Sequence, residues 1–188
     1  MTYDLLVMPM MRIIRTQRAA MQSACLIAML LQHGVAFSQA QFEEDFDDSS
    51  KPWQEVAIQL PAMPTRSALV PFYVSPTATQ TFTIAPDSVS VGSDGVVRYV
   101  MVARSESGAE NTSYDGLRCA SLEHKSYAFG HADGNWSRSR RTDWVAITGN
   151  AANRQYAALA ESYFCDGSMV AGQAADIVKR LKTKRSLR

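Results

Sequence analysis

Apolar and polar residues alternate along much of the chain between residues 55 and 105, with the two-residue period of half-buried β-strands. One segment, 95–105, has apolar side chains on both of its faces. Val97 and Tyr99 lie on one face, and Val100 and Val102 lie on the other. This pattern predicts a central strand that is covered on both sides. The alternation also predicts strands over 55–61 and 81–85.

Prolines set limits on two neighbouring segments. The apolar segment 69–74 contains Pro71, which has no backbone N–H to donate to a ladder. We therefore expect this segment to lie at the edge of the sheet. For the same reason, Pro86 is expected to end the strand that begins near Thr81.

The next part of the chain is also predicted to form strands. Segments 113–121 and 122–129 are rich in tyrosine and leucine, and Asp133-Gly134 is a favoured hairpin turn. Segment 143–148 is expected to add one more short strand; the alternative is a stretch of chain that leads to the next helix. Short strands joined by glycine-containing turns indicate an antiparallel meander.

The period of the apolar positions changes from 2 to about 3.6 after residue 150. The stripe over 156–164 predicts a helix with Asn150 as its N-cap. A second stripe over 174–181 predicts a helix that begins near Val170. The expected fold is therefore α+β: an antiparallel meander sheet followed by two C-terminal helices packed on it.

The first 40 residues have a different composition. Three arginines within 12–18 precede a short apolar stretch, 24–31, and small residues stand at Ser38 and Ala40. These features predict a secretory signal peptide that is cleaved near Ala40. The apolar stretch is much shorter than the ~20 residues that a transmembrane helix needs.

The signal peptide sets the expected domain organisation. We expect a signal peptide (1–40), an acidic flexible leader (41–52), a single α+β domain (53–182) and a basic C-terminal tail (183–188). Because the residues before Met11 are unusual for the basic region of a signal peptide, the start codon is left open between Met1, Met10 and Met11. The mature chain is predicted to be periplasmic and to have no transmembrane segment.

Export also affects the expected redox state of the cysteines. Once residues 1–40 are removed, Cys119 and Cys165 remain, and an even number of cysteines in an exported chain indicates a disulfide. The chain-entropy model gives a loop of this length about 4 kcal/mol of stabilisation. The alternative is that both thiols are free and buried.

Several short motifs occur in a fixed order along the chain. They include "KPWQEVAIQLP", "LVPFYV", "VGSDGVVRYV", "KSYAFGHADGNW" and "YFCDG". Together they resemble the CNP1-like family of exported bacterial proteins of unknown function, from about Trp53 to Gly167. The resemblance implies export and one small domain, and it brings no activity, substrate or cofactor.

The composition is that of an ordinary globular protein, with 46% hydrophobic and 20% charged residues. Residues 1–40 hold three of the 19 basic residues and one of the 18 acidic residues, so 16 basic and 17 acidic residues follow them. The two ends of this part carry opposite charge, and the sequence between them indicates no like-charged face. No specific nucleic-acid partner is predicted, and the basic C-terminal end is interpreted as a solvated helix end.

Several potential metal ligands lie close together in the sequence. They are Cys119, Glu123, His124, His131 and Asp133. Their spacing matches no zinc motif, and neighbouring strand residues point to opposite faces of a sheet. The sequence therefore predicts no metal and no cofactor.

An enzymatic role is the alternative hypothesis. A small envelope hydrolase would need a pair of carboxylates, for which Asp115, Glu123 and Asp133 are the candidates. We instead interpret these three acids as turn-forming or surface residues. A purely structural accessory domain is a further alternative.

The segment 135–144 is the best candidate for a binding surface. It places Arg138, Arg140 and Arg141 between Trp136 and Trp144, and arginine and tryptophan are enriched at binding sites. The alternative is that the tryptophans cap the core while the arginines remain solvated. We predict a non-enzymatic binding module of the bacterial cell envelope. Its partner, an unknown protein or envelope component, and its oligomeric state are left open.

Overall fold

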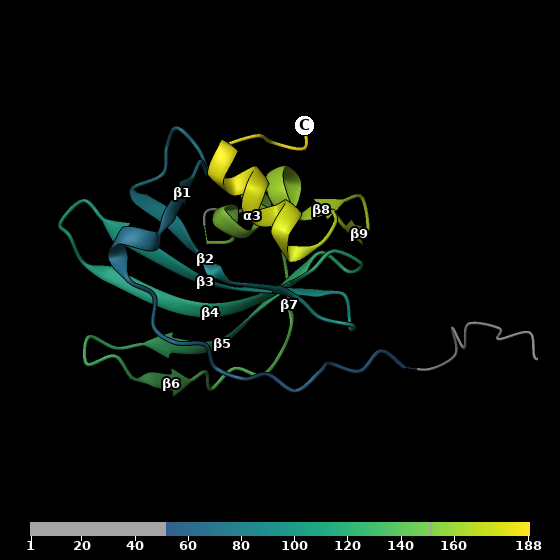
Figure 1. Ribbon diagram of the computed structural model, residues 1–188, viewed down its shortest axis with the longest axis horizontal. Coiled ribbons are helices and arrows are strands. Elements are labelled where there is room, and N and C mark those ends of the chain that lie inside the picture. The colour runs from purple at the N-terminus through teal and green to yellow at the C-terminus, as the bar shows by residue number, and fades with distance from the viewer. Residues whose placement is uncertain (1–51, 151) are drawn as a thin grey trace, which may run out of the picture. The chain divides into compact units, whose positions relative to one another are not determined.

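A computed structural model describes residues 52–150 and 152–188 (Figure 1). Its main element is an antiparallel sheet in which the strands follow one another in chain order from β1 to β6, and β7 pairs with β5. The strands are β1 (Val70–Phe72), β2 (Gln80–Val91), β3 (Val96–Ser105), β4 (Glu110–Arg118), β5 (Glu123–Gly130), β6 (Trp136–Arg138) and β7 (Val145–Ala146). The predicted meander is confirmed, with β1 at the edge and β3 between β2 and β4.

The helices follow the sheet in the chain and lie together on one of its faces (Figure 1). They are α2 (Arg154–Leu159), the π-helical turn η2 (Ala160–Phe164) and α3 (Ala174–Thr183); a short 3-10 turn, η1 (Arg66–Ala68), precedes β1. The α+β prediction is confirmed, but the predicted starts of the two helices are wrong. The N-cap of α2 is Asn153 rather than Asn150, and α3 begins at Ala174 because the hairpin of β8 (Cys165–Asp166) and β9 (Met169–Val170) comes before it.

None of the helices in the described part of the chain is long and apolar enough to cross a membrane.

The larger apolar core lies between the sheet and the helices. Tyr99 and Leu117 contribute from the strands, and Leu159, Phe164 and Ile177 contribute from the helical region; all five are completely buried. The rings of Tyr99 and Phe164 pack nearly edge to face, with their centroids 5.0 Å apart. Burial of this kind is the main stabilising contribution in a small domain.

A disulfide between Cys119 and Cys165 joins the sheet to the helical region, as the sequence predicts. Cys119 follows β4, and Cys165 follows the π-helical turn. Both residues are buried, and their Cα atoms are 5.5 Å apart, within the normal range for a disulfide.

The opposite face of the sheet carries a smaller core, which an N-terminal strap (residues 53–64) covers. Tyr114, Tyr127 and Ala128 are buried there, and Ile58 and Leu60 of the strap pack against them. The predicted strand over 55–61 is wrong, because the strap is extended but pairs with no strand of the described chain.

The predicted end of a strand at Pro86 is also wrong, because β2 continues through it to Val91. The pairing of β2 with β3 shifts between Ala85 and Ser90, which forms a bulge where proline is tolerated. Ser88 fills the gap in the ladder. Its hydroxyl donates to the Ala85 carbonyl and accepts a hydrogen bond from the Val100 N–H, each at 2.7 Å.

Candidate functional site

Trp136, near the start of the candidate binding segment 135–144, is hydrogen-bonded to the strap. It opens β6, and its indole Nε1 donates a hydrogen bond to the Pro61 carbonyl at 2.8 Å. The ring is half-buried and packs near Tyr114, with a centroid distance of 6.4 Å. Trp136 is therefore a packing residue of the smaller core.

Trp144 fastens the other end of the segment. Its Nε1 lies 3.4 Å from a carboxylate oxygen of Glu55 in the strap. Its ring meets the ring of Trp53 edge to face at a centroid distance of 5.8 Å. The two tryptophans thus hold the strap and the loop together.

The three arginines of the segment extend from this fixed frame into solvent. Arg138, Arg140 and Arg141 are exposed, and none of them forms an ion pair with a residue that the structure describes. Ser139 shapes the loop between them: its hydroxyl accepts from the Arg141 N–H at 3.2 Å and donates to the Arg141 carbonyl at 3.1 Å. The loop therefore presents guanidinium groups that have no partner in the described protein.

A cavity of about 500 Å³ borders these arginines, and we call it the arginine cavity. Its lining comes from β5, the following turn, β6, the loop and β7. The lining residues are His124, Lys125, Ser126, Phe129, His131, Ser137, Arg138, Ser139, Arg140, Arg141, Asp143 and Val145. This volume lies within the ~300–1,000 Å³ that small-molecule sites usually occupy.

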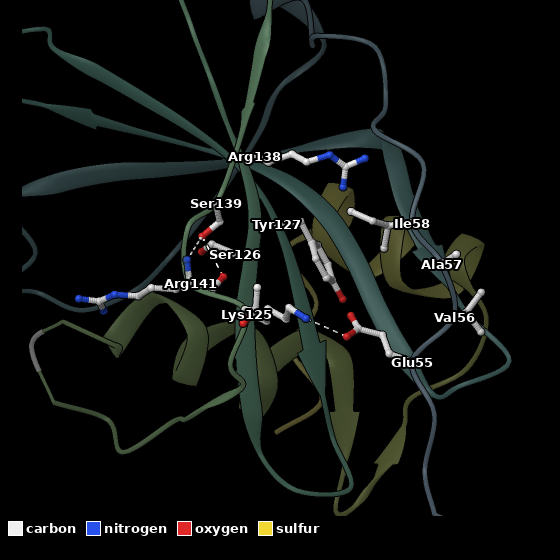
Figure 2. Close-up of a pocket in the computed structure, with 11 residues that line it drawn as sticks. Glu55, Val56, Ala57, Ile58, Lys125, Ser126, Tyr127, Arg138, Ser139 and Arg141 are labelled. Carbon is white, nitrogen blue, oxygen red and sulfur yellow. Dashed lines mark hydrogen bonds and ion pairs between the residues drawn. The ribbon is translucent and has the colours of Figure 1, made fainter.

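A smaller cavity of about 320 Å³ lies between the strap and β5 (Figure 2). It shares Arg138 and Arg141 with the arginine cavity. In Figure 2, Arg138 extends toward Ile58 of the strap, whereas Arg141 extends the other way. The loop thus offers positive charge on both of its sides.

Lys125 also lines both cavities, but its charge is already compensated. Its Nζ lies 2.9 Å from a carboxylate oxygen of Glu55, as the dashed line in Figure 2 shows. Burial by itself would raise the pKa of Glu55, but the nearby Tyr127 hydroxyl and Lys125 ammonium outweigh it and lower that pKa. Glu55 is therefore ionised at neutral pH and neutralises Lys125.

A second ion pair fixes the start of the strap. The buried Arg98 guanidinium contacts the Asp94 carboxylate at 2.5 and 3.1 Å and donates to the Val56 carbonyl at 3.3 Å. Asp94 in turn accepts the Val56 N–H at 2.9 Å. Next to this pair, the Arg118 guanidinium stacks over the Trp53 ring at 3.7 Å. Directional polar contacts thus position the strap without a β-ladder.

His124 and His131 both line the arginine cavity. The His124 ring stacks on Tyr156 at a centroid distance of 3.7 Å, and burial lowers its pKa, so it is neutral at pH 7. Within the described residues, no group of three or more His, Cys, Asp or Glu side chains is placed to hold a metal. Of the five potential ligands, Cys119 is in the disulfide and Glu123 pairs with Arg118 at 3.2 Å.

The three candidate carboxylates do not come together at a common site. Glu123 is in the ion pair with Arg118, and Asp133 accepts the Asn135 N–H at 3.0 Å in the hairpin turn. Neither these two acids nor Asp115 lines either of the two cavities beside the arginine loop. Each of these two cavities has one carboxylate in its lining, Glu55 in the smaller one and Asp143 in the arginine cavity, so neither supplies the pair that the hydrolase alternative requires.

Asp115 has a role that sequence reasoning missed, because it is completely buried rather than in a turn or on the surface. It accepts a hydrogen bond from the Ser113 hydroxyl at 2.5 Å. Burial raises its pKa from 3.8 to about 6. A signal was present in the sequence, since Asp115 alternates in phase with Leu117 and therefore points toward the helices.

The fold and its cavities define a small, disulfide-linked α+β domain with a cation-lined cavity of ligand size. Residues 48–182 match the model of the CNP1-like family, and the chain belongs to this family. No curated protein and no solved structure matches the chain.

Proposed function

We propose that this protein is a non-enzymatic binding module of the bacterial cell envelope, and that it acts in the periplasm after removal of the signal peptide. The observation that carries the proposal is the loop of Arg138, Arg140 and Arg141. These arginines are exposed, have no ion-pair partner within the described chain, and border a cavity of about 500 Å³. Unpaired guanidinium groups on a fixed loop are suited to recognising an anionic partner.

The disulfide supports the proposed location. Stable disulfides persist in oxidising compartments such as the periplasm and are rare in the cytosol. The predicted signal peptide, residues 1–40, lies outside the described residues.

The location can be tested on the protein expressed from its own signal sequence. We expect it in the periplasmic fraction, with an N-terminus near Gln41 and with Cys119 and Cys165 resistant to alkylation until a reductant is added. A full-length chain in the cytosolic fraction with two alkylatable thiols would contradict the proposal.

The binding role can be tested by removing the three guanidinium groups together. The mature protein is immobilised and exposed to solubilised cell envelope. The triple variant Arg138→Ala, Arg140→Ala, Arg141→Ala should lose the components that the wild-type protein captures. The matched control is Lys182→Ala, Arg185→Ala, Arg188→Ala, which removes the same charge from the exposed C-terminal end.

The control should capture the same components as the wild-type protein. If the triple variant also does so, the arginine loop is not the binding surface. Arginines are better targets than Trp136, because Trp136 also donates a hydrogen bond to the strap. A loss of binding in a Trp136 variant could then result from displacement of the strap.

A further inference from the structure

We infer that the arginine cavity binds one amphipathic anion: a small molecule with a carboxylate or phosphate group joined to an apolar chain or ring. This inference rests on the proposed function and specifies the chemistry of its ligand. It follows from the charge, the apolar surface and the size of the cavity.

The charge of the lining selects an anion. Arg140 and Arg141 contribute two positive charges and Asp143 contributes one negative charge, while Arg138 also lines the cavity but extends its guanidinium toward the strap (Figure 2). Lys125 is neutralised by Glu55, as its 2.9 Å contact shows, and the lowered pKa of His124 keeps that side chain neutral. The lining therefore has an excess of positive charge, on planar groups that can hold a carboxylate or phosphate through paired hydrogen bonds.

The same cavity has an apolar part that an inorganic anion would leave uncovered. Phe129 of β5 is 38% exposed and Val145 of β7 is 40% exposed, and both line the cavity. Neither belongs to one of the two apolar cores. A ligand with an apolar portion would remove these side chains from water and gain free energy by doing so.

The size and shape of the cavity favour one bound molecule over a lipid surface. A cavity of about 500 Å³ is concave and of small-molecule size. A surface that inserts into a bilayer presents a broad, outward-facing apolar area. Two apolar side chains within a hollow do not form such an area.

The test uses soluble probes and the mature, disulfide-linked protein. Hexyl phosphate carries both parts of the inferred ligand, whereas inorganic phosphate and 1-hexanol carry one part each. Isothermal titration should show hexyl phosphate binding at least tenfold more tightly than either of the other probes. Vesicles of phosphatidylglycerol form a separate arm that tests a membrane surface as the source of the anion.

Variants assign the two parts of the ligand to the two parts of the cavity. Arg140→Ala with Arg141→Ala should weaken hexyl phosphate at least tenfold, whereas the control Arg185→Ala with Arg188→Ala should not change it. Phe129→Ser should reduce the affinity for hexyl phosphate to that for inorganic phosphate. Phe129 lies outside both cores, so this variant should remain folded.

Three results would overturn the inference: equal affinities for hexyl phosphate and inorganic phosphate, binding to vesicles without binding to soluble hexyl phosphate, or no binding of any probe. If no probe binds but the triple arginine variant still loses its envelope partners, the ligand class is wrong and the proposed function stands. If hexyl phosphate binds as expected but the triple variant keeps its envelope partners, the inference stands and the proposed function fails.

Discussion

The two faces of the sheet are held together by different kinds of contact. On the helix-covered face, buried apolar side chains such as Leu159 and Phe164 surround a disulfide. On the strap-covered face, the strap is held by the Arg98–Asp94 and Lys125–Glu55 ion pairs and the hydrogen bond from Trp136. Apolar burial is strong and non-directional, whereas polar contacts contribute little net stability but fix positions.

This difference suggests that one face mainly stabilises the domain and the other mainly positions the arginine loop. The helix-covered face supplies most of the stability of the domain. The strap-covered face sets the position of the arginine loop, which lies at its border. Substitutions on the first face should therefore reduce stability, and substitutions in the loop should reduce binding.

The largest effect is expected from the disulfide. Replacing Cys119 and Cys165 by alanine frees a loop with a sequence separation of 46 residues, and the unfolded chain gains entropy worth about 4 kcal/mol. Urea unfolding of the mature protein should show this loss, and adding a reductant to the wild-type protein should reproduce it. A loss below about 1 kcal/mol would show that the covalent link is not a main source of stability.

A somewhat smaller loss is expected from the apolar core on the same face. Leu159 is completely buried, so Leu159→Ala removes apolar contacts, leaves a cavity and should cost about 3 kcal/mol. Leu187 is 37% exposed, and Leu187→Ala should change stability by less than about 0.5 kcal/mol. Equal losses in the two variants, measured by urea unfolding, would contradict the assignment of the core.

Asp115 is a polar exception on the helix-covered face, and it should make stability depend on pH. Its pKa is about 6 in the folded protein and 3.8 in the unfolded chain. The folded state therefore holds this proton more tightly, and the resulting stability is present below pH 4 and lost as the pH rises through 6. With 1.36 kcal/mol per pKa unit, a shift from 3.8 to about 6 corresponds to a loss on the order of 3 kcal/mol.

The matched variant is Asp115→Asn, which has nearly the same shape and does not titrate. The stability difference between variant and wild-type protein should shift in favour of the variant between pH 4 and pH 7. Unfolding curves at several pH values measure this shift. Parallel pH profiles would show that Asp115 does not titrate in this range.

The smallest effect is expected from one contact of the strap. Trp136→Phe keeps an aromatic ring but removes the donor to the Pro61 carbonyl, which should cost about 1 kcal/mol. Tyr73 is 68% exposed, so Tyr73→Phe is a control that should change stability by less than about 0.5 kcal/mol. If Trp136→Phe behaves like this control, the hydrogen bond to the strap does not hold it in place.

The helix-covered face could largely be predicted from the sequence. The alternation within 95–105 and the stripe over 174–181 reflect local periodicity, and the two cysteines that follow residue 40 allow only one pairing. The strap could not be predicted, because alternation over 55–61 looks the same whether the chain joins a ladder or is held by side chains. The strap is held by side chains that are distant in sequence, such as Asp94 and Trp136, and the local pattern does not reveal them.

The candidate site could be predicted only in part. The charge and solvent exposure of Arg138, Arg140 and Arg141 could be expected from their loop. The cavity could not, because it requires Phe129 and Val145, which lie on two different strands, to meet that loop. Pairing of β7 with β5 brings them there, and nothing local to residue 129 or residue 145 indicates that pairing.

We propose that the arginine loop, rather than the helix-covered face, recognises the ligand. The most direct test is a nuclear magnetic resonance titration of ¹⁵N-labelled mature protein with hexyl phosphate. Backbone amide shifts should change mainly within 124–131 and 136–145, with smaller changes in the strap. Changes centred on α2, α3 or the β8–β9 hairpin, with the arginine loop unaffected, would contradict it.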